Sequence, residues 1–367
     1  MRVQRLMCLA FSGCAAGYAG GAGAVLTHYY SFDDVDIVGS SGAADGVGSA
    51  NALPTGALGG ANITTGQPGI LGQAYRFVRD DTGSAGNNTT PGDASDFENT
   101  LRLAAGSVPA GNAPRTIALW FNFGGGAGQN KLFGYGSPNT DNDGTTGEAL
   151  DIGLEGGGIR LRNFNGNITY GSGLDFAPGG ADAGWHHLAL RVNPGASTFA
   201  DIELFLDGTP LAPADAGDAD LNDTLAIADS AFGIGNIGYD HFLLNGFTGL
   251  IDELRIYDHA VSNAEIVQLA LPPGVVPGDT DNDGDIDGSD MLNALSGYTG
   301  PGGTGATPAT GDTDADGDVD DTDIGLMMTN YTGPLAPPAA VPEPVSVLWL
   351  GSGGLLFSGR RRRQATA

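Results

Sequence analysis

The C-terminal quarter of the chain contains a duplication that leaves few choices of structure. Residues 278–301 align with residues 311–334 at a constant offset of 33 without a gap, and 13 of the 24 paired positions are identical. Both copies carry aspartate at loop positions 1, 3, 5, 7, 9 and 12 and glycine at position 6. Because so many like charges would repel one another without a cation, the duplication predicts two equivalent loops that each coil around a metal ion.

Calcium is the ion that this arrangement suits. It takes six to eight oxygen ligands at about 2.3–2.6 Å, and glycine at position 6 permits the sharp bend with which a loop surrounds it. We therefore predict Ca²⁺ as the cofactor, with Ile286 and Val319 at position 8 pairing or anchoring the two loops. The predicted ligands are Asp279, Asp281, Asp283, Asp285 and Asp290 in the first loop and Asp312, Asp314, Asp316, Asp318 and Asp323 in the second.

A short helix is predicted after each loop, over 290–295 and 323–328, and no helix pattern precedes either loop. Position 12 is Asp in place of the Glu of an EF-hand. Tandem loop-helix units of this kind resemble type I dockerin repeats, and the resemblance implies a module over 273–336 that binds a cohesin-like partner through its helices. Positions 10 and 11 read Gly-Ser in one copy and Asp-Thr in the other, which is weak support for that partner. A thrombospondin-type calcium-binding spacer is the alternative.

The net charge excludes one class of partner. The chain has 43 acidic and 15 basic residues, a formal charge of −28, and Lys131 is its only lysine. Nucleic acids need a basic surface, so we expect no nucleic-acid partner. Thirteen of the acidic residues fall within 279–290 and 312–323, so much of the charge belongs to the predicted loops.

Residues 25–272 show short apolar or alternating runs separated by turn residues, and 63 glycines with 20 prolines argue against a mainly helical chain. This spacing predicts a mainly β fold, a sandwich of antiparallel strands. Ser262 and Glu265 form a capping-box pattern that predicts a helix over 263–271, which Pro272 and Pro273 end. The predicted strands are 25–32, 74–78, 116–123, 149–154, 158–163, 185–192, 201–207, 232–237 and 249–257.

Five segments of this body occur in an informative order: 29–33 (YYSFD), 116–121 (TIALWF), 184–189 (GWHHLA), 202–208 (IELFLDG) and 249–258 (GLIDELRIYD). Together they resemble the laminin-G-like, concanavalin A-like jelly roll, which implies that fold for residues 25–272 and a carbohydrate or surface protein as ligand. Residues 39–66 and 79–115 are too long for ordinary sandwich loops, so we interpret them as mobile or binding loops.

Asp33 or its neighbour Asp34, near the first strand, and Asp252 or its neighbour Glu253, on the last, could supply a structural calcium site in the jelly roll, and we take Asp33 and Asp252 as the candidate pair. In the resembling fold the chain ends lie close together, and several members hold a calcium near them. Oxygen ligands from two distant strands would suit a hard cation. Solvated or arginine-paired carboxylates are the alternative.

The body offers little sign of catalysis. Asp201 and Glu203 have the alternate spacing of paired carboxylates in glycanases on the same sandwich, but Phe205 occupies the next position on that face and no other catalytic motif is visible. His186 and His187 are adjacent on a strand, so they point to opposite faces and cannot hold one metal together. Trp120 and Trp185 are expected in the core. We therefore expect a binding protein and no enzyme.

The N-terminal segment has a targeting pattern. Residues 1–24 combine Arg2 and Arg5 with a short apolar stretch and small residues, which is typical of a secretory signal. The four residues ending at Cys14 also resemble a lipobox, which would make Cys14 a lipidated N-terminus. A disordered N-terminus is the alternative.

The C-terminal segment, 337–367, has a targeting pattern of its own. Val341-Pro342-Glu343-Pro344 precedes an apolar run over 345–359 and four arginines, Arg360 to Arg363. This order resembles the PEP-CTERM sorting signal, which implies transient anchoring in the membrane, cleavage by an exosortase and an outer-membrane-bearing bacterium as the host. A permanent tail anchor is the alternative.

These patterns predict an exported protein of the cell surface or extracellular matrix. Its jelly roll would recognise a carbohydrate or surface protein, and its calcium-loaded repeats would mediate attachment to another protein. A structural matrix protein with the jelly roll as scaffold and a glycan-degrading enzyme are the two alternatives.

Overall fold

A computed structural model describes most of the body and of the repeat region. None of its described helices is long and apolar enough to cross a membrane. The predicted secretory signal with Cys14, the Val-Pro-Glu-Pro motif and the arginine tail lie outside the described residues. The described residues are 25–54, 62–79, 100–126, 128–137, 148–163, 166–171, 173–216, 218–237, 246–271, 278–281, 285–313 and 317–332.

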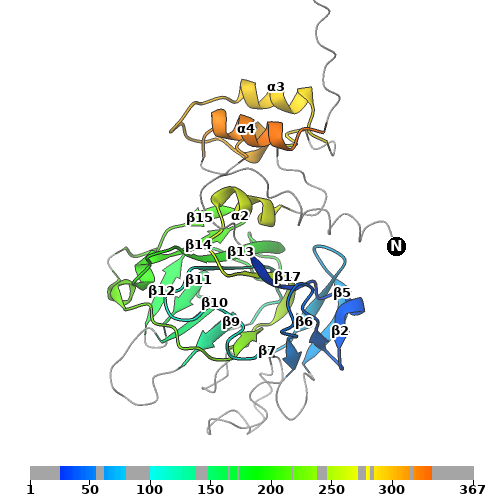
Figure 1. The fold of residues 1–367 in the computed structure, drawn as a ribbon, viewed down its shortest axis with the longest axis vertical. Helices are drawn as coiled ribbons and strands as arrows, with labels where there is room; N and C mark the ends of the chain where they lie inside the picture. Colours follow the sequence, from blue (N-terminus) through cyan, green and yellow to red (C-terminus); the bar gives the residue numbers. More distant parts are fainter. Residues whose placement is uncertain are drawn as a thin grey trace, which may run out of the picture.

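The body consists of two antiparallel sheets packed face to face (Figure 1). The predicted mainly β sandwich is therefore confirmed. In spatial order, the first sheet contains β15 (Thr209–Leu211), β14 (Ile202–Leu206), β13 (Trp185–Val192), β8 (Arg115–Phe123), β17 (Gly249–Tyr257), β6 (Gln73–Phe77) and β5 (Ile63–Pro68), with β1 (Leu26–Tyr30) also paired to β17. The second contains β12 (Asn167–Tyr170), β11 (Gly158–Arg162), β10 (Ala149–Glu155), β9 (Asn130–Gly136), β16 (Phe232–Ile234), β7 (Leu101–Leu103) and β4 (Leu53–Pro54).

The remaining elements are short. A small hairpin joins β2 (Ile37–Val38) to β3 (Gly42–Ala43). In the described part of the chain the helices are α2 (Asn263–Ala270), α3 (Gly288–Ser296) and α4 (Asp321–Thr329), and the 3-10 turns are η2 (Asp34–Asp36), η4 (Phe199–Asp201), η5 (Ala219–Asn222) and η6 (Pro308–Thr310).

The main core lies between the two sheets because alternate residues of each strand point the same way. On β13, Leu188 and Leu190 are fully buried in this core, and on β10 Ile152 occupies the corresponding inner layer. The rings of Phe133 and Phe232 stack at 5.5 Å between centroids within the second sheet. These apolar side chains, which point into the space between the sheets, are the ones whose alternation along the sequence predicted the strands.

Strand β17 is the centre of the first sheet and changes partner along its length. Its first half pairs with β6 and its second half with β1, while β8 runs along its other side. The register with β8 shifts between Asp252 and Arg255, and Glu253 there has a φ of 53°, which is uncommon for a residue other than glycine. The irregularity lies where β1 and β6 meet end to end.

Several predicted boundaries need correction. Residues 39–66 and 79–115 are not loops throughout, because β3, β4 and β7 lie within them and the first residues of β5 do too. Strands β3, β4 and β7 are two or three residues long, too short for an alternation to be recognised, and β5 (ITTGQP) has only one large apolar residue, Ile63. Strand β9 was not predicted, because the run NKLFGYG is buried at every position and does not alternate.

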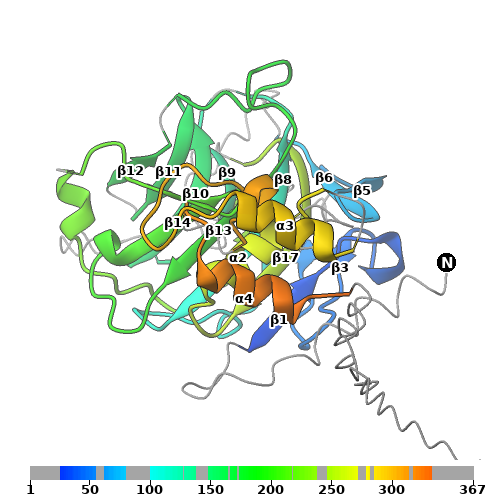
Figure 2. The ribbon, with the colours of Figure 1, turned by 90° about the horizontal axis from the view of Figure 1, so that it is seen from above.

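Helix α2 covers the outer face of the first sheet. It begins at the predicted capping box of Ser262 and Glu265. Its Ile266 packs with Ala118, Ala189 and Phe205 of the sheet in a second apolar cluster. The repeat region, with α3 and α4 side by side, lies beyond α2 on the side away from the sandwich (Figures 1 and 2).

Candidate metal centre

Each loop of the repeat leads directly into its helix. Asp287 and Asp320 are the N-cap residues of α3 and α4, and each side chain accepts a hydrogen bond at 2.6 Å from the backbone amide two residues later. Aspartate at an N-cap satisfies a helix amide that otherwise has no partner. Both helices therefore begin two residues before the predicted starts, at 288 and 321.

The aspartate at position 12 ties the start of each loop to the start of its helix. Asp290 accepts from the Thr280 amide at 2.6 Å and from the Asp287 amide at 2.8 Å, and Asp323 repeats both bonds with Thr313 and Asp320 at the same distances. Burial acts to raise the pKa of Asp290, but these amide bonds outweigh it and lower the pKa. The carboxylate is therefore ionised, as a calcium ligand must be.

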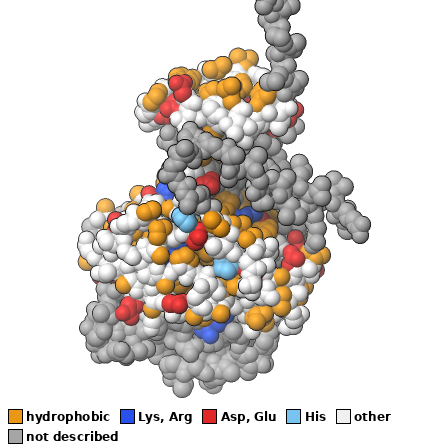
Figure 3. Space-filling model, in the orientation of Figure 1, with side chains coloured by type: hydrophobic (Ala, Val, Ile, Leu, Met, Phe, Trp, Pro, Cys, Tyr) orange, Lys and Arg blue, Asp and Glu red, His pale blue; other side chains and the backbone are white. Residues whose placement is uncertain are grey.

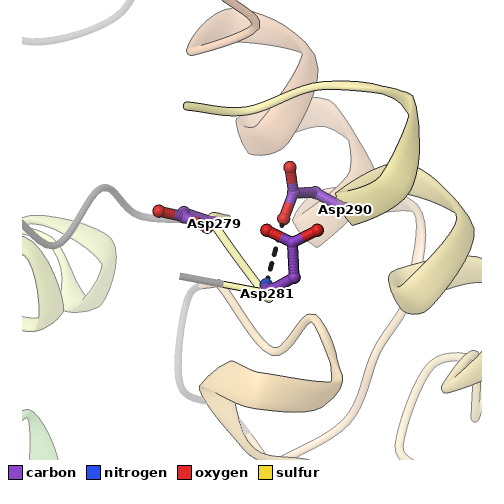
Figure 4. A group of neighbouring side chains, drawn as sticks. All are labelled: Asp279, Asp281 and Asp290. Atoms are coloured by element: carbon purple, nitrogen blue, oxygen red, sulfur yellow. Dashed lines mark hydrogen bonds between the residues drawn. The ribbon is translucent and has the colours of Figure 1, made fainter. Parts of the chain in front are cut away.

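Carboxylate oxygens converge at equivalent places in the two copies. Within the described residues, one oxygen from each of Asp285, Asp287 and Asp290 lies within 4.8 Å of the others, and so does one oxygen from each residue 33 positions later. A third such group joins Asp279 and Asp281 to Asp290 (Figure 4). The second-copy group is Asp318, Asp320 and Asp323.

An oxygen-only donor set of this density fits a hard cation such as calcium better than zinc or copper, which favour nitrogen and sulfur. Asp279, Asp281, Asp285, Asp290, Asp318 and Asp323 are thus predicted ligands that the structure brings together. Asp312 is 4 % exposed and accepts a bond from the Gly317 amide at 3.2 Å, outside these groups. The predicted ligands Asp283, Asp314 and Asp316 lie outside the described residues.

Reciprocal contacts make the two copies one unit. The backbone of Ile286 exchanges two hydrogen bonds with Thr332, one of them through the threonine hydroxyl, and Val319 exchanges the same two bonds with Thr299. All four distances are 2.9 or 3.0 Å. Ile286 and Val319 are fully buried in a core that the two copies share. The apolar residue at position 8 of each loop therefore pairs the two loops, as predicted.

The outer faces of α3 and α4 carry exposed apolar side chains. Leu292, Leu295 and Met328 are 58–64 % exposed, and apolar atoms gather over these helices in Figure 3. Tyr298, at 43 % exposure, donates a hydrogen bond to Asp321 at 3.0 Å. Residues 278–332 contain no lysine, arginine or histidine. We name Leu292, Leu295 and Met328 the helix ridge.

The candidate calcium pair of the jelly roll, Asp33 and Asp252, lies around the turn before β6. Asp33 accepts from the Gln73 amide at 2.8 Å, and Asp252 accepts from the Ile70 and Leu71 amides at 2.9 and 3.2 Å. Burial, with the neighbouring carboxylate of Glu253, raises the pKa of Asp252 to about 8. Among the described residues the two carboxylates do not form one of the converging groups.

The carboxylates considered for glycan hydrolysis have separate structural contacts. Asp201 is the capping-box partner of Thr198, the N-cap of η4; it accepts from the Ser197 and Thr198 amides at 2.8 and 2.9 Å, and these bonds lower its pKa. Glu203 accepts from Arg191 at 2.7 Å and from Asn193 at 2.6 Å. The two side chains therefore work as a cap and as an ion-pair partner.

The adjacent histidines point to opposite faces of β13, as predicted. His186 contacts Asp207 at 2.8 Å through Nδ1, and this hydrogen bond raises its pKa. His187 is fully buried beside Trp120, and neither ring nitrogen has a hydrogen-bond partner in the described part of the chain. Trp120 is also buried, yet it donates to the Leu269 carbonyl of α2 at 3.2 Å, so it lies on the outer face of the sheet under α2 and not between the sheets.

A hollow at the edge of the sandwich was not predicted. Its volume is about 460 Å³, within the range of ligand pockets. The carboxylates of Asp229 and Asp258 line it together with His28, which bridges Asp45 and the Ser107 carbonyl at 2.6 and 2.7 Å. These residues are far apart in the sequence and form no motif. No sequence pattern could therefore have predicted this hollow.

Comparisons with known proteins support the jelly roll. Residues 95–267 match the Laminin_G_3 family, described as the concanavalin A-like lectin/glucanases superfamily. The matched residues lie within the two-sheet antiparallel sandwich of the body. No curated protein matches the sequence.

Solved structures with similar folds include carbohydrate-binding domains and glycoside hydrolases. Domain 4 of the Geobacillus stearothermophilus arabinanase AbnA, in complex with arabinotriose, is 19 % identical, with 68 % of this chain and 100 % of that chain covered and a TM-score of 0.42. Trypanosoma rangeli sialidase is 16 % identical, with 71 % and 34 % covered and a TM-score of 0.43. The Ruminococcus gnavus IT-sialidase CBM40, bound to α2,3-sialyllactose, is 14 % identical, with 43 % and 83 % covered and a TM-score of 0.32. Likenesses of this size concern the fold and say nothing of what this chain binds.

Proposed function

We propose that the protein is an exported, non-enzymatic recognition protein with two binding parts. The repeats bind two calcium ions and attach the protein to a partner protein, and the jelly roll recognises a carbohydrate or surface protein. The observation that carries the proposal is the pair of equivalent carboxylate groups, Asp285, Asp287 and Asp290 and their counterparts 33 residues later.

Calcium would be held by the converging carboxylates and would remove the repulsion between them. Position 12 has a double role in this scheme, because Asp290 and Asp323 already fix the loop start against the helix start. Ion binding would therefore set the positions of α3 and α4. This would present the helix ridge to a partner as one rigid surface, which lowers the entropy cost of binding.

The helix ridge supports attachment to a protein. Large apolar side chains that are exposed on paired helices are typical of an interface. The dockerin-like order of loop and helix favours a cohesin-like partner. The absence of basic residues over 278–332 further favours a partner with a basic rim around its apolar contact.

The hollow beside β1 supports a saccharide ligand for the jelly roll. Carboxylates accept hydrogen bonds from sugar hydroxyls, and Asp229 and Asp258 line one cavity with the apolar residues Val108 and Pro109. Asp229 accepts from the Gly106 amide at 2.6 Å and Asp258 from the Val25 amide at 3.2 Å, so both carboxylates are held in place at the hollow.

Calorimetry of the full chain with calcium tests the first part. We expect heat for two sites, with Asp290→Ala and Asp323→Ala each removing one. Absence of heat at millimolar calcium would overturn the calcium-binding proposal, because extracellular calcium sites are filled at that concentration.

A glycan array tests the second part. Binding that is lost in Asp229→Ala and kept in Asp201→Ala would support a saccharide site in the hollow. No binding to any glycan would favour the structural matrix protein. Turnover of a polysaccharide that is lost in Glu203→Gln would favour the enzyme.

A further inference from the structure

His28, on β1, connects two segments that lie far from it in the sequence. Its Nδ1 lies 2.6 Å from the Asp45 carboxylate, and its Nε2 lies 2.7 Å from the Ser107 carbonyl. The side chain is mostly buried, and a Cβ on Gly48 would meet its Nδ1 at 3.0 Å. The ring is therefore fixed between Asp45 and Ser107, and residues 106–110 form one wall of the hollow beside β1.

Both atoms that the His28 ring meets can only accept hydrogen bonds. A backbone carbonyl has no proton to donate. The Asp45 carboxylate accepts from four backbone amides, those of Tyr29, Val47, Gly48 and Ala50. Burial acts to raise the pKa of Asp45, but the bonds from His28 and from backbone amides outweigh it and lower the pKa. Both ring nitrogens must therefore donate, and only the doubly protonated, positively charged ring can do so.

Loss of one proton from His28 breaks one of these two bonds. The remaining proton stays on Nδ1, because a hydrogen bond to an ionised carboxylate is about twice as strong as one to a neutral acceptor. Nε2 then presents a lone pair to the Ser107 carbonyl, and two acceptors 2.7 Å apart repel. Histidine changes charge between about pH 5 and pH 8, so a rise in pH through this range releases Ser107 from the ring.

The rest of the wall has anchors of its own. Val108 is buried in the main core, and the Pro109 carbonyl accepts from the Tyr135 hydroxyl at 3.2 Å. The Gly106 amide donates to Asp229 at 2.6 Å. Loss of the bond from His28 therefore moves the turn at Ser107 without unfolding the wall.

Few charged groups surround the His28 ring. Asp45 contacts it directly, and Asp229 and Asp258 line the same hollow. His259 contacts Asp258 at 2.6 Å, so it is the other histidine near this site. Among the described residues no lysine or arginine lines the hollow. Deprotonation of His28 therefore also removes a positive charge from a hollow that has two carboxylates in its lining.

We propose that His28 is a positioning residue of the hollow, whose protonated ring holds the Ser107 carbonyl and so keeps the wall in its binding shape. Saccharide binding in the hollow is strong at mildly acidic pH and weakens as His28 loses a proton. The inference rests on the proposed saccharide site.

His186 supplies a matched control for the test. Its Nδ1 lies 2.8 Å from the Asp207 carboxylate and its Nε2 lies 2.7 Å from the Asp182 carbonyl, so it has the same pair of acceptors as His28. In the described part of the chain it does not line the hollow. Glutamine has no charge to lose in this pH range, so His28→Gln and His186→Gln each remove one titrating ring.

Nitrogen-15 NMR of the full chain tests the role of His28 without a ligand. Between about pH 5 and pH 8 we expect the Gly106 and Ser107 amide signals to shift with the same midpoint as the His28 ring. The shift should persist in His186→Gln and be lost in His28→Gln. A His28 ring with one proton at pH 5 would overturn the proposal. So would a shift that persists in His28→Gln or that disappears in His259→Gln.

A glycan array read at about pH 5 and pH 8 connects this titration to binding. We expect the glycans bound at pH 5 to bind at least several-fold more weakly at pH 8 in the natural protein and in His186→Gln, and His28→Gln to bind equally at both. Equal binding of the natural protein at the two pH values would overturn the pH dependence and leave the saccharide site standing. No bound glycan at either pH would overturn the saccharide site, and the NMR titration would still decide the role of His28.

Discussion

The jelly roll and the repeat module are stabilised in different ways. The jelly roll has a continuous apolar core between two sheets and a second cluster under α2. Among its described residues the module has four fully buried apolar side chains, Ile286, Ala294, Val319 and Met327, and its two loops contain thirteen acidic residues. A core that small supplies little stability by itself. We therefore expect calcium binding to be coupled to folding in the module and separate from the folding of the jelly roll.

Removal of calcium should give the largest difference in amide protection between the module and the jelly roll. With a chelator, we expect the amide protection of α3 and α4 to be lost completely, because uncompensated carboxylates repel and the core cannot hold the loops. Strand β13 should keep its protection. Hydrogen exchange of the full chain measures both regions at once. Persistent protection of α3 without calcium would show that the module folds by its core alone.

Truncation of a core side chain in the sandwich should have the opposite result, with the jelly roll destabilised and the module unaffected. Phe133→Ala removes a fully buried ring that stacks on Phe232, so we expect a loss of about 3–5 kcal/mol in the free energy of unfolding of the jelly roll. The heat of calcium binding should not change. Ile286→Ala, in the module core, is the matched variant and should weaken calcium binding without affecting the urea midpoint of the jelly roll.

The pH dependence of the jelly roll should depend on His187. Burial, with the nearby charge of Arg255, lowers its pKa to about 3. Between about pH 6.5 and 3 the unfolded chain therefore binds a proton that the folded chain does not, and stability falls as pH falls. His187→Leu should flatten this slope and raise stability at pH 7, because two buried nitrogens without partners are removed. Urea unfolding at pH 7 and pH 5 measures it, and an unchanged slope would contradict the assignment.

The reciprocal bonds of the module should give the smallest effect. Thr299→Val and Thr332→Val each remove a hydroxyl that accepts from the other copy, so we expect a loss of about 1 kcal/mol for each. Thermal unfolding of the calcium-loaded module should show nearly equal shifts. Clearly unequal shifts would mean that the two copies do not support one another symmetrically.

Much of this architecture follows from local sequence patterns. The alternation in 185–192 and 249–257 predicted β13 and β17 at their observed bounds, and the Ser262-Glu265 pair predicted where α2 begins. Such features depend on neighbouring residues only, so one strand or one cap can be predicted without knowledge of the rest. The helix starts in the module were predicted two residues late, because Asp287 and Asp320 act as caps as well as members of the carboxylate groups.

The sequence by itself determined that the chain has a β-rich body and two equivalent acidic loops. It also determined that a helix with an N-terminal capping box lies between the body and the loops. The tertiary structure decided which partners β17 takes along its length, that Asp33 and Asp252 meet the turn before β6, and that Trp120 lies under α2. It also decided that Asp312 and Asp318 are buried, whereas their counterparts in the first copy, Asp279 and Asp285, are half-buried and exposed. Duplicated sequences have the same local preferences, and only contacts between distant parts of the chain can make them different.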